Sequence, residues 1–60
     1  MDKTLWALDV DDLTIDQLVS ALRAVRETYG NLAVTSEDGY TFCGMQVVED
    51  DDGNRSLEVY

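Results

Sequence analysis

The sequence predicts one α+β domain: an N-terminal arm or strand, one amphipathic helix, and a three-stranded antiparallel β-meander on which the helix packs. Apolar residues recur at helical spacing in the first half of the chain, whereas shorter runs in the second half alternate. Acidic turns that contain glycine separate those shorter runs. A chain of 60 residues fits a single domain, residues 1–60, made of an extension (1–12) and a helix-plus-meander body (13–60).

The N-terminal extension contains the stretch TLWALDV, in which Trp6, Leu8 and Val10 alternate with other residues. This pattern fits either a fourth strand or a packed extended arm. Trp6 is either a core residue or an interface anchor, because tryptophan is enriched in binding hot spots. A chain this short buries little apolar area, which favours packing in the core or between subunits.

The helix is expected over residues 15–29. Its apolar face is formed by Ile15, Leu18, Val19, Leu22, Val25 and Tyr29. Thr14 and Gln17 have the spacing of a capping box, which marks the start of a helix. Gly30 supplies the residue with left-handed backbone conformation that commonly ends one.

The last acidic run predicts a β-hairpin with a three-residue loop that ends at Gly53. This loop pairs Val47 with Leu57 and Met45 with Val59, so the four apolar side chains share one face. A two-residue turn would place apolar side chains opposite polar ones. The register therefore favours the longer loop.

A second acidic turn, residues 37–39, predicts another hairpin that pairs Val34 with Phe42. The phase of the apolar residues changes after this hairpin, which predicts a β-bulge near Cys43 and Gly44. The expected inward-facing set is Ile15, Leu18, Val19, Leu22, Val25, Leu32, Val34, Phe42, Met45, Val47, Leu57 and Val59.

The charge of the chain is strongly unbalanced, with 13 acidic residues against four basic ones and a formal net charge of −9. This charge repels nucleic acid and anionic membranes and attracts basic protein surfaces. No apolar run is long enough to span a membrane, and the start of the chain lacks the features of a signal peptide. We therefore expect a cytoplasmic protein, located in the host cytoplasm if a phage encodes it.

We predict no catalytic residues, no cofactor and no metal. The chain has no histidine, and its one cysteine, Cys43, has no basic neighbour in sequence to lower its pKa. One cysteine without histidine excludes an internal disulfide and disfavours zinc. Aligning Gly53 with the glycine of an EF-hand loop puts Val48 and Val59 at ligand positions, so the calcium motif fails.

Two short motifs carry a resemblance to a known family. Thr14, Ile15, Leu18, Val19 and Leu22 match the opening T-[IV]-x-[ED]-L-[IV]-x-x-L, with Asp16-Gln17 in place of its x-acid pair. Gly30, Asn31 and Val34 match a G-[DN]-x-P-V step in which Ala33 replaces the proline. On these motifs residues 13–60 resemble a family of short uncharacterised phage and bacterial proteins with a helix, a β-meander and an acidic last hairpin. The resemblance implies a phage or prophage origin and transfers no catalytic residue.

Two acidic poles are the candidate binding surfaces. We expect the 37–38 turn to lie near the helix start, beside Asp9, Asp11, Asp12 and Asp16, and the run 49–52 to lie at the opposite end of the domain. The poles are explained either by solubility or by competition for a basic groove built for DNA. The candidate partner-binding residues are Glu49, Asp50, Asp51, Asp52, Asp9, Asp11, Asp12, Glu37, Asp38 and Trp6.

The predicted function is a non-enzymatic acidic binding protein that blocks a basic nucleic-acid-binding surface of a host protein and does not bind nucleic acid or membrane itself. In composition the chain is similar to small acidic phage inhibitors of the anti-CRISPR and anti-defence type, and we expect it to act as a DNA mimic. The alternatives are a small dimerising assembly protein and an acidic antitoxin. We also expect a homodimer, because short chains gain stability by covering apolar surface.

Overall fold

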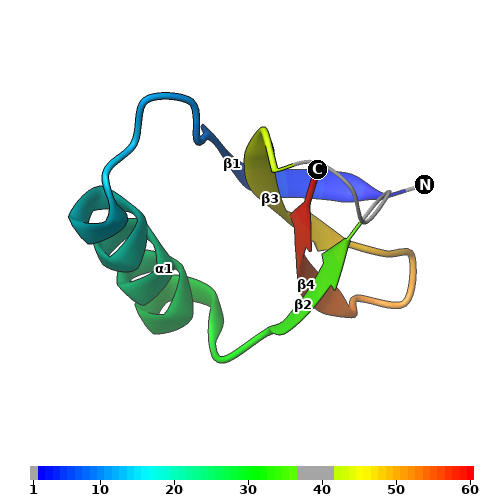
Figure 1. The fold of residues 1–60 in the computed structure, drawn as a ribbon. Coiled ribbons are helices and arrows are strands. Elements are labelled where there is room, and N and C mark those ends of the chain that lie inside the picture. The colour runs from blue at the N-terminus through cyan, green and yellow to red at the C-terminus, as the bar shows by residue number, and fades with distance from the viewer. Residues whose placement is uncertain (1, 37–41) are drawn as a thin grey trace.

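The structure is a computed structural model that describes residues 2–36 and 42–60, and it has an α+β fold with one helix and a four-stranded mixed sheet (Figure 1). The elements are β1 (Lys3–Asp9), α1 (Ile15–Tyr29), β2 (Ala33–Ser36), β3 (Gly44–Glu49) and β4 (Arg55–Val59). The predicted α+β class is confirmed. The N-terminal extension is a strand, and the prediction of a three-stranded antiparallel meander is wrong.

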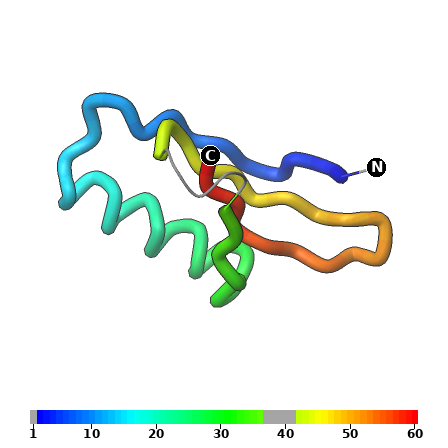
Figure 2. Tube along the Cα trace, turned by 45° about the vertical axis from the view of Figure 1, so that its right-hand side comes forward, coloured from blue at the N-terminus to red at the C-terminus, as the bar shows by residue number. Residues whose placement is uncertain are grey.

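The sheet has the strand order β1-β3-β4-β2. β3 pairs antiparallel with both β1 and β4, whereas β2 pairs parallel with β4. The two outer strands, β1 and β2, therefore run in the same direction, and α1 is the crossover that parallel strands require. The β3–β4 hairpin lies between them (Figures 1 and 2).

β2 does not form the hairpin that the sequence predicts. Val34 lies opposite Leu57 of β4 rather than opposite Phe42, and Phe42 lies outside every strand with 49% of its surface exposed. The turn expected at residues 37–39 lies outside the described residues. Alternation of apolar and polar residues shows which side chains of a strand share a face, but it does not show which strand lies beside it.

The β3–β4 hairpin has the predicted register, with Met45 opposite Val59 and Val47 opposite Leu57. The backbone N–H of Asp50 donates to the carbonyl oxygen of Asn54 at 3.0 Å, which closes a three-residue loop. Gly53, the last residue of that loop, has φ of +84°. The loop length and the left-handed glycine are both confirmed.

Two irregularities shape the sheet. At the start of β3, the N–H groups of Cys43 and Gly44 both donate to the carbonyl oxygen of Tyr60, which is the two-against-one arrangement of a β-bulge. In β1 the register shifts between Thr4 and Trp6, so Leu5 is an extra residue there. The first irregularity lies where the sequence predicts a bulge; the second is unexpected.

α1 has the predicted bounds and the predicted ends. The Thr14 side chain accepts from the Gln17 N–H at 3.2 Å, and the Gln17 side chain accepts from the Thr14 N–H at 2.9 Å. Gly30 has φ of +98°, and its N–H donates to the carbonyl oxygen of Arg26 at 2.9 Å. The cap and the terminal glycine therefore define this helix, as expected.

The core lies between α1 and one face of the sheet. Its buried side chains are Val25, Met45, Val47 and Leu57. The partly buried residues around them are Leu5, Trp6, Leu8, Val10, Leu18, Ala21, Tyr29, Leu32 and Val59. Trp6 is opposite Val47 in the register and packs against this core, so it is a core residue.

Five residues of the predicted inward set are exposed instead: Ile15 (81%), Val19 (40%), Leu22 (39%), Val34 (65%) and Phe42 (49%). For Ile15, Val19 and Leu22 the reason lies in the orientation of α1, which packs its other apolar side chains on the core. Ile15, Val19 and Leu22 follow one another at spacings of four and three residues and form a second stripe beside the first. Because only one of the two stripes packs on the sheet, the second stripe stays exposed and part of the sheet face stays uncovered.

Candidate functional site

Four consecutive carboxylates, residues 49–52, occupy the end of β3 and the hairpin loop. Two of them stabilise the hairpin itself. Glu49 accepts from the Arg55 Nε at 2.8 Å, and it also lies opposite Lys3 of β1. The Asp50 Oδ1 accepts the backbone N–H groups of Asp52 and Asn54, each at 2.9 Å. Glu49 and Asp50 are therefore structural residues as well as charges.

The hydrogen bonds around Asp50 lower its pKa below the ordinary value of 3.8. The backbone N–H of Asn54 is the main cause, and the N–H groups of Asp52 and Gly53 act in the same direction. Partial desolvation opposes them without reversing the direction. Hydrogen bonds to a carboxylate stabilise its charged form, so the Asp50 side chain is negatively charged at neutral pH.

Asp51 and Asp52 lie at the tip of this loop with exposed side chains. A hollow of about 300 Å³ on the adjoining sheet surface is lined by Asp2, Asp50 and Glu58 together with Arg55. The structure therefore adds Asp2 to the carboxylates near the hairpin. The sequence does not reveal Asp2 as part of this group, because its position depends on β1 being paired with β3.

The other predicted pole lies in the turn between β1 and α1. The Asp11 N–H donates to Asp9 Oδ1 at 3.1 Å, and the Leu13 N–H donates to the Val10 oxygen at 3.3 Å. Asp12 has a left-handed φ of +67° within that turn. Figures 1 and 2 show this turn and the β3–β4 loop at opposite ends of the molecule, as predicted. Glu37 and Asp38, assigned to the same pole, lie outside the described residues.

The surroundings of the two poles differ. The β1–α1 turn leads directly into the N-terminus of α1, whose backbone N–H groups carry a partial positive charge. This charge partly offsets the carboxylates of that turn. Among the described residues no helix end lies at the β3–β4 loop, and α1 is well separated from this loop in both views (Figures 1 and 2).

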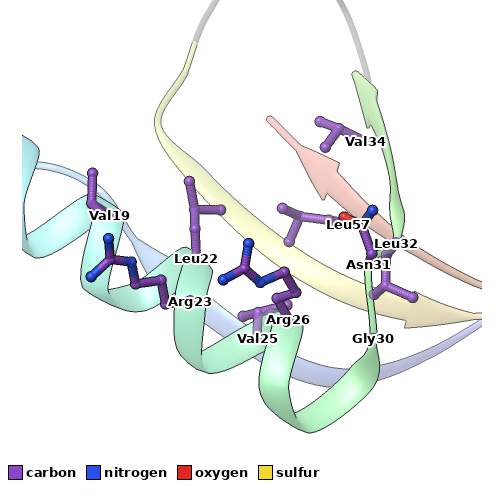
Figure 3. A pocket seen from close by; sticks show the side chains of 10 residues that line it. All are labelled: Val19, Leu22, Arg23, Val25, Arg26, Gly30, Asn31, Leu32, Val34 and Leu57. Atoms are coloured by element: carbon purple, nitrogen blue, oxygen red, sulfur yellow. The ribbon is translucent and has the colours of Figure 1, made fainter.

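A second candidate surface is a groove beside α1, with a volume of about 340 Å³ (Figure 3). Its apolar lining comes from α1, the segment after it, β2 and β4: Val19, Leu22, Val25, Leu32, Val34 and Leu57. Arg23 and Arg26 of α1 also line it. Nothing in the sequence analysis indicates this groove, because the predicted meander would have covered the whole apolar stripe of the helix.

Among residues 2–36 and 42–60, no three His, Cys, Asp or Glu side chains are placed to hold a metal ion. Cys43 is exposed. In the same part of the chain, no helix has the length and the apolar content needed to cross a lipid bilayer.

Comparisons with protein-family models, with curated proteins and with solved structures found no match to this chain. The resemblance to short phage and bacterial proteins remains a prediction from the motifs around Thr14 and Gly30.

Proposed function

We propose that this chain is a non-enzymatic binding protein that presents the carboxylates of its β3–β4 loop to a basic surface of a partner protein. In its most specific form, the partner is a nucleic-acid-binding protein whose basic groove the loop occupies. The observation that supports the proposal most is the fixed loop geometry, in which Asp50 accepts two backbone N–H groups and Gly53 closes the turn.

A fixed loop favours binding because little conformational freedom is lost when a partner docks. Asp51 and Asp52 follow each other at the tip, so their Cα atoms are about 3.8 Å apart. Duplex DNA carries one charge per ~1.7 Å of its axis, so a basic groove built for it accepts closely spaced anions. The net charge of −9 adds long-range attraction toward such a groove.

One observation favours a second candidate function, a small assembly protein that dimerises. The groove beside α1 and the exposed stripe of Ile15, Val19 and Leu22 leave apolar area uncovered. Short chains gain stability when a second copy covers such area. Sedimentation at micromolar concentration tests this second candidate: a chain that is only monomeric rules it out, because the assembly protein requires a dimer and the acidic binder does not.

The test of the proposed function compares two variants with the same change in charge. D51N/D52N removes two carboxylates from the β3–β4 loop, and D11N/D12N removes two from the β1–α1 turn. A partner captured from cells with the tagged wild-type chain is purified, and its affinity for each variant is measured at two salt concentrations. We expect weaker binding for D51N/D52N only, a steep loss with salt, and displacement by duplex DNA. The proposal is contradicted if the partner's affinity does not change with the loop substitution, with salt concentration or with added DNA.

A further inference from the structure

The groove beside α1 exists because α1 lies toward one side of the sheet. At its C-terminal end, the Tyr29 hydroxyl donates to the carbonyl oxygen of Leu5 in β1 at 3.3 Å. β1 is the strand farthest from β2 in the order β1-β3-β4-β2. Above β2, Val34 therefore faces the groove without a helix over it and is 65% exposed, whereas Leu57 of β4 is buried at the floor of the groove (Figure 3). A second helix beside α1 would complete this layer.

Arg23 and Arg26 give the groove a charge opposite to that of the molecule. They are two of only four basic residues in a chain with 13 acidic ones. Within the described part of the chain neither guanidinium group has a hydrogen bond or an ion pair, in contrast to Arg55, which is paired with Glu49. Figure 3 shows both side chains extending from the same side of α1 as Leu22.

Two arginines three residues apart lie on one side of a helix, so they are spaced to meet carboxylates on successive turns of a neighbouring helix. Neighbouring helices pack with their axes 8–10 Å apart, close enough for such pairs beside an apolar contact. Guanidinium groups also bind carboxylates with two parallel hydrogen bonds where the geometry allows.

From these observations we propose that the groove binds an amphipathic helix of another protein that carries an apolar stripe flanked by Asp or Glu. Its apolar side chains pack on the exposed Val19, Leu22 and Val34, and its carboxylates pair with Arg23 and Arg26. The groove is distinct from the acidic β3–β4 loop, so this inference does not depend on the proposed function.

The selectivity of the groove is opposite to what net charge predicts. A protein with a net charge of −9 attracts cationic peptides when only long-range attraction acts. At physiological salt, however, charges separated by more than ~8 Å are largely screened. The nearby Arg23 and Arg26 then determine which peptide binds in the groove.

The experiment uses two synthetic 16-residue peptides as probes, each designed with leucine at helical spacing. One has glutamate at all flanking positions and the other has lysine. Each is titrated at physiological salt into the isotopically labelled full chain, with methyl NMR signals of Leu22, Val34 and Leu57 followed. Three variants accompany the wild type: R23Q/R26Q, V34E in the groove, and R55Q as a control for loss of an arginine elsewhere.

We expect the glutamate peptide to shift the groove signals, to become helical by circular dichroism, and to bind about tenfold more weakly to R23Q/R26Q. V34E is expected to abolish binding, and R55Q to leave it unchanged. Equal or tighter groove binding by the lysine peptide overturns the inference. The inference is also overturned if the shifts are confined to other surfaces, or if no groove signal shifts at millimolar peptide. It is likewise overturned if the peptide binds in an extended form that protects the β2 amides, or if a dimer of this chain already fills the groove.

Discussion

The hydroxyl of Tyr29, in the last turn of α1, donates a hydrogen bond to the carbonyl oxygen of Leu5 at 3.3 Å. Leu5 is the extra residue where the β1–β3 register shifts, and a bulge takes one residue out of the regular ladder. The Tyr29 ring also lies under the Arg55 guanidinium, 6.0 Å from the ring centroid. Tyr29 therefore links the helix to β1 and to the start of β4.

Replacing Tyr29 with phenylalanine is expected to lower the free energy of unfolding by about 1 kcal/mol, because the partly buried Leu5 oxygen loses its donor. Urea unfolding followed by circular dichroism measures the loss. Y60F is the matched control, since the Tyr60 ring lies against Gly44 and its hydroxyl makes no hydrogen bond within the described structure. Equal losses in Y29F and Y60F would show that the Leu5 bond contributes nothing.

Replacing Gly53 with alanine is expected to destabilise the protein by about 1 kcal/mol, because φ of +84° is unfavourable for a residue with a Cβ atom. No atom lies within 4 Å of a Cβ placed there, so the effect is one of backbone conformation and not of crowding. Asparagine tolerates left-handed backbone better, so G53N should lose less. Thermal unfolding of both variants gives the comparison; a G53A protein as stable as wild type would refute the loop geometry.

Asp50 should make the stability of the hairpin depend on pH. Its pKa is lowered in the folded protein, so its stabilising contribution is fully present above the ordinary value of 3.8. That contribution is lost as pH falls below 3.8 through the lower pKa of the folded state. The neutral side chain of D50N keeps an oxygen acceptor but does not titrate.

The stability difference between wild type and D50N should therefore shrink as pH falls through this range. Urea midpoints measured at pH values from neutral down to about 2.5 follow the difference through the ordinary carboxyl range. A difference that stays constant with pH, or grows as pH falls, is incompatible with the assigned hydrogen bonds.

Local signals in the sequence predicted local structure well. The Thr14–Gln17 capping box and Gly30 define both ends of α1, and the register argument gives the pairing of Val47 with Leu57. Each of these depends on residues close in sequence or on one turn. The acidic residues 9–12 before the helix and the run 49–52 also lie at opposite ends, as expected, whereas the 37–38 turn assigned to the first pole lies outside the described residues.

Long-range pairing was not predictable in the same way. The alternation around Val34 is the same whether its neighbour is antiparallel β3 or parallel β4, and the acidic turn after it favoured the wrong choice. The wrong pairing of β2 also concealed the groove beside α1. With β2 placed beside β4 and α1 lying toward β1, Val34 and Leu22 become the walls of an open groove that the predicted meander did not contain.

We propose the β3–β4 loop, rather than the net charge of the whole protein, as the surface that binds a basic partner. A nine-residue arginine peptide titrated into the ¹⁵N-labelled chain at physiological salt tests it through backbone amide shifts. We expect the largest shifts at residues 50–54, a marked reduction of these shifts in D51N/D52N, and no reduction at those residues in D11N/D12N. Largest shifts at residues 9–12, or shifts that both variants reduce equally, would contradict it.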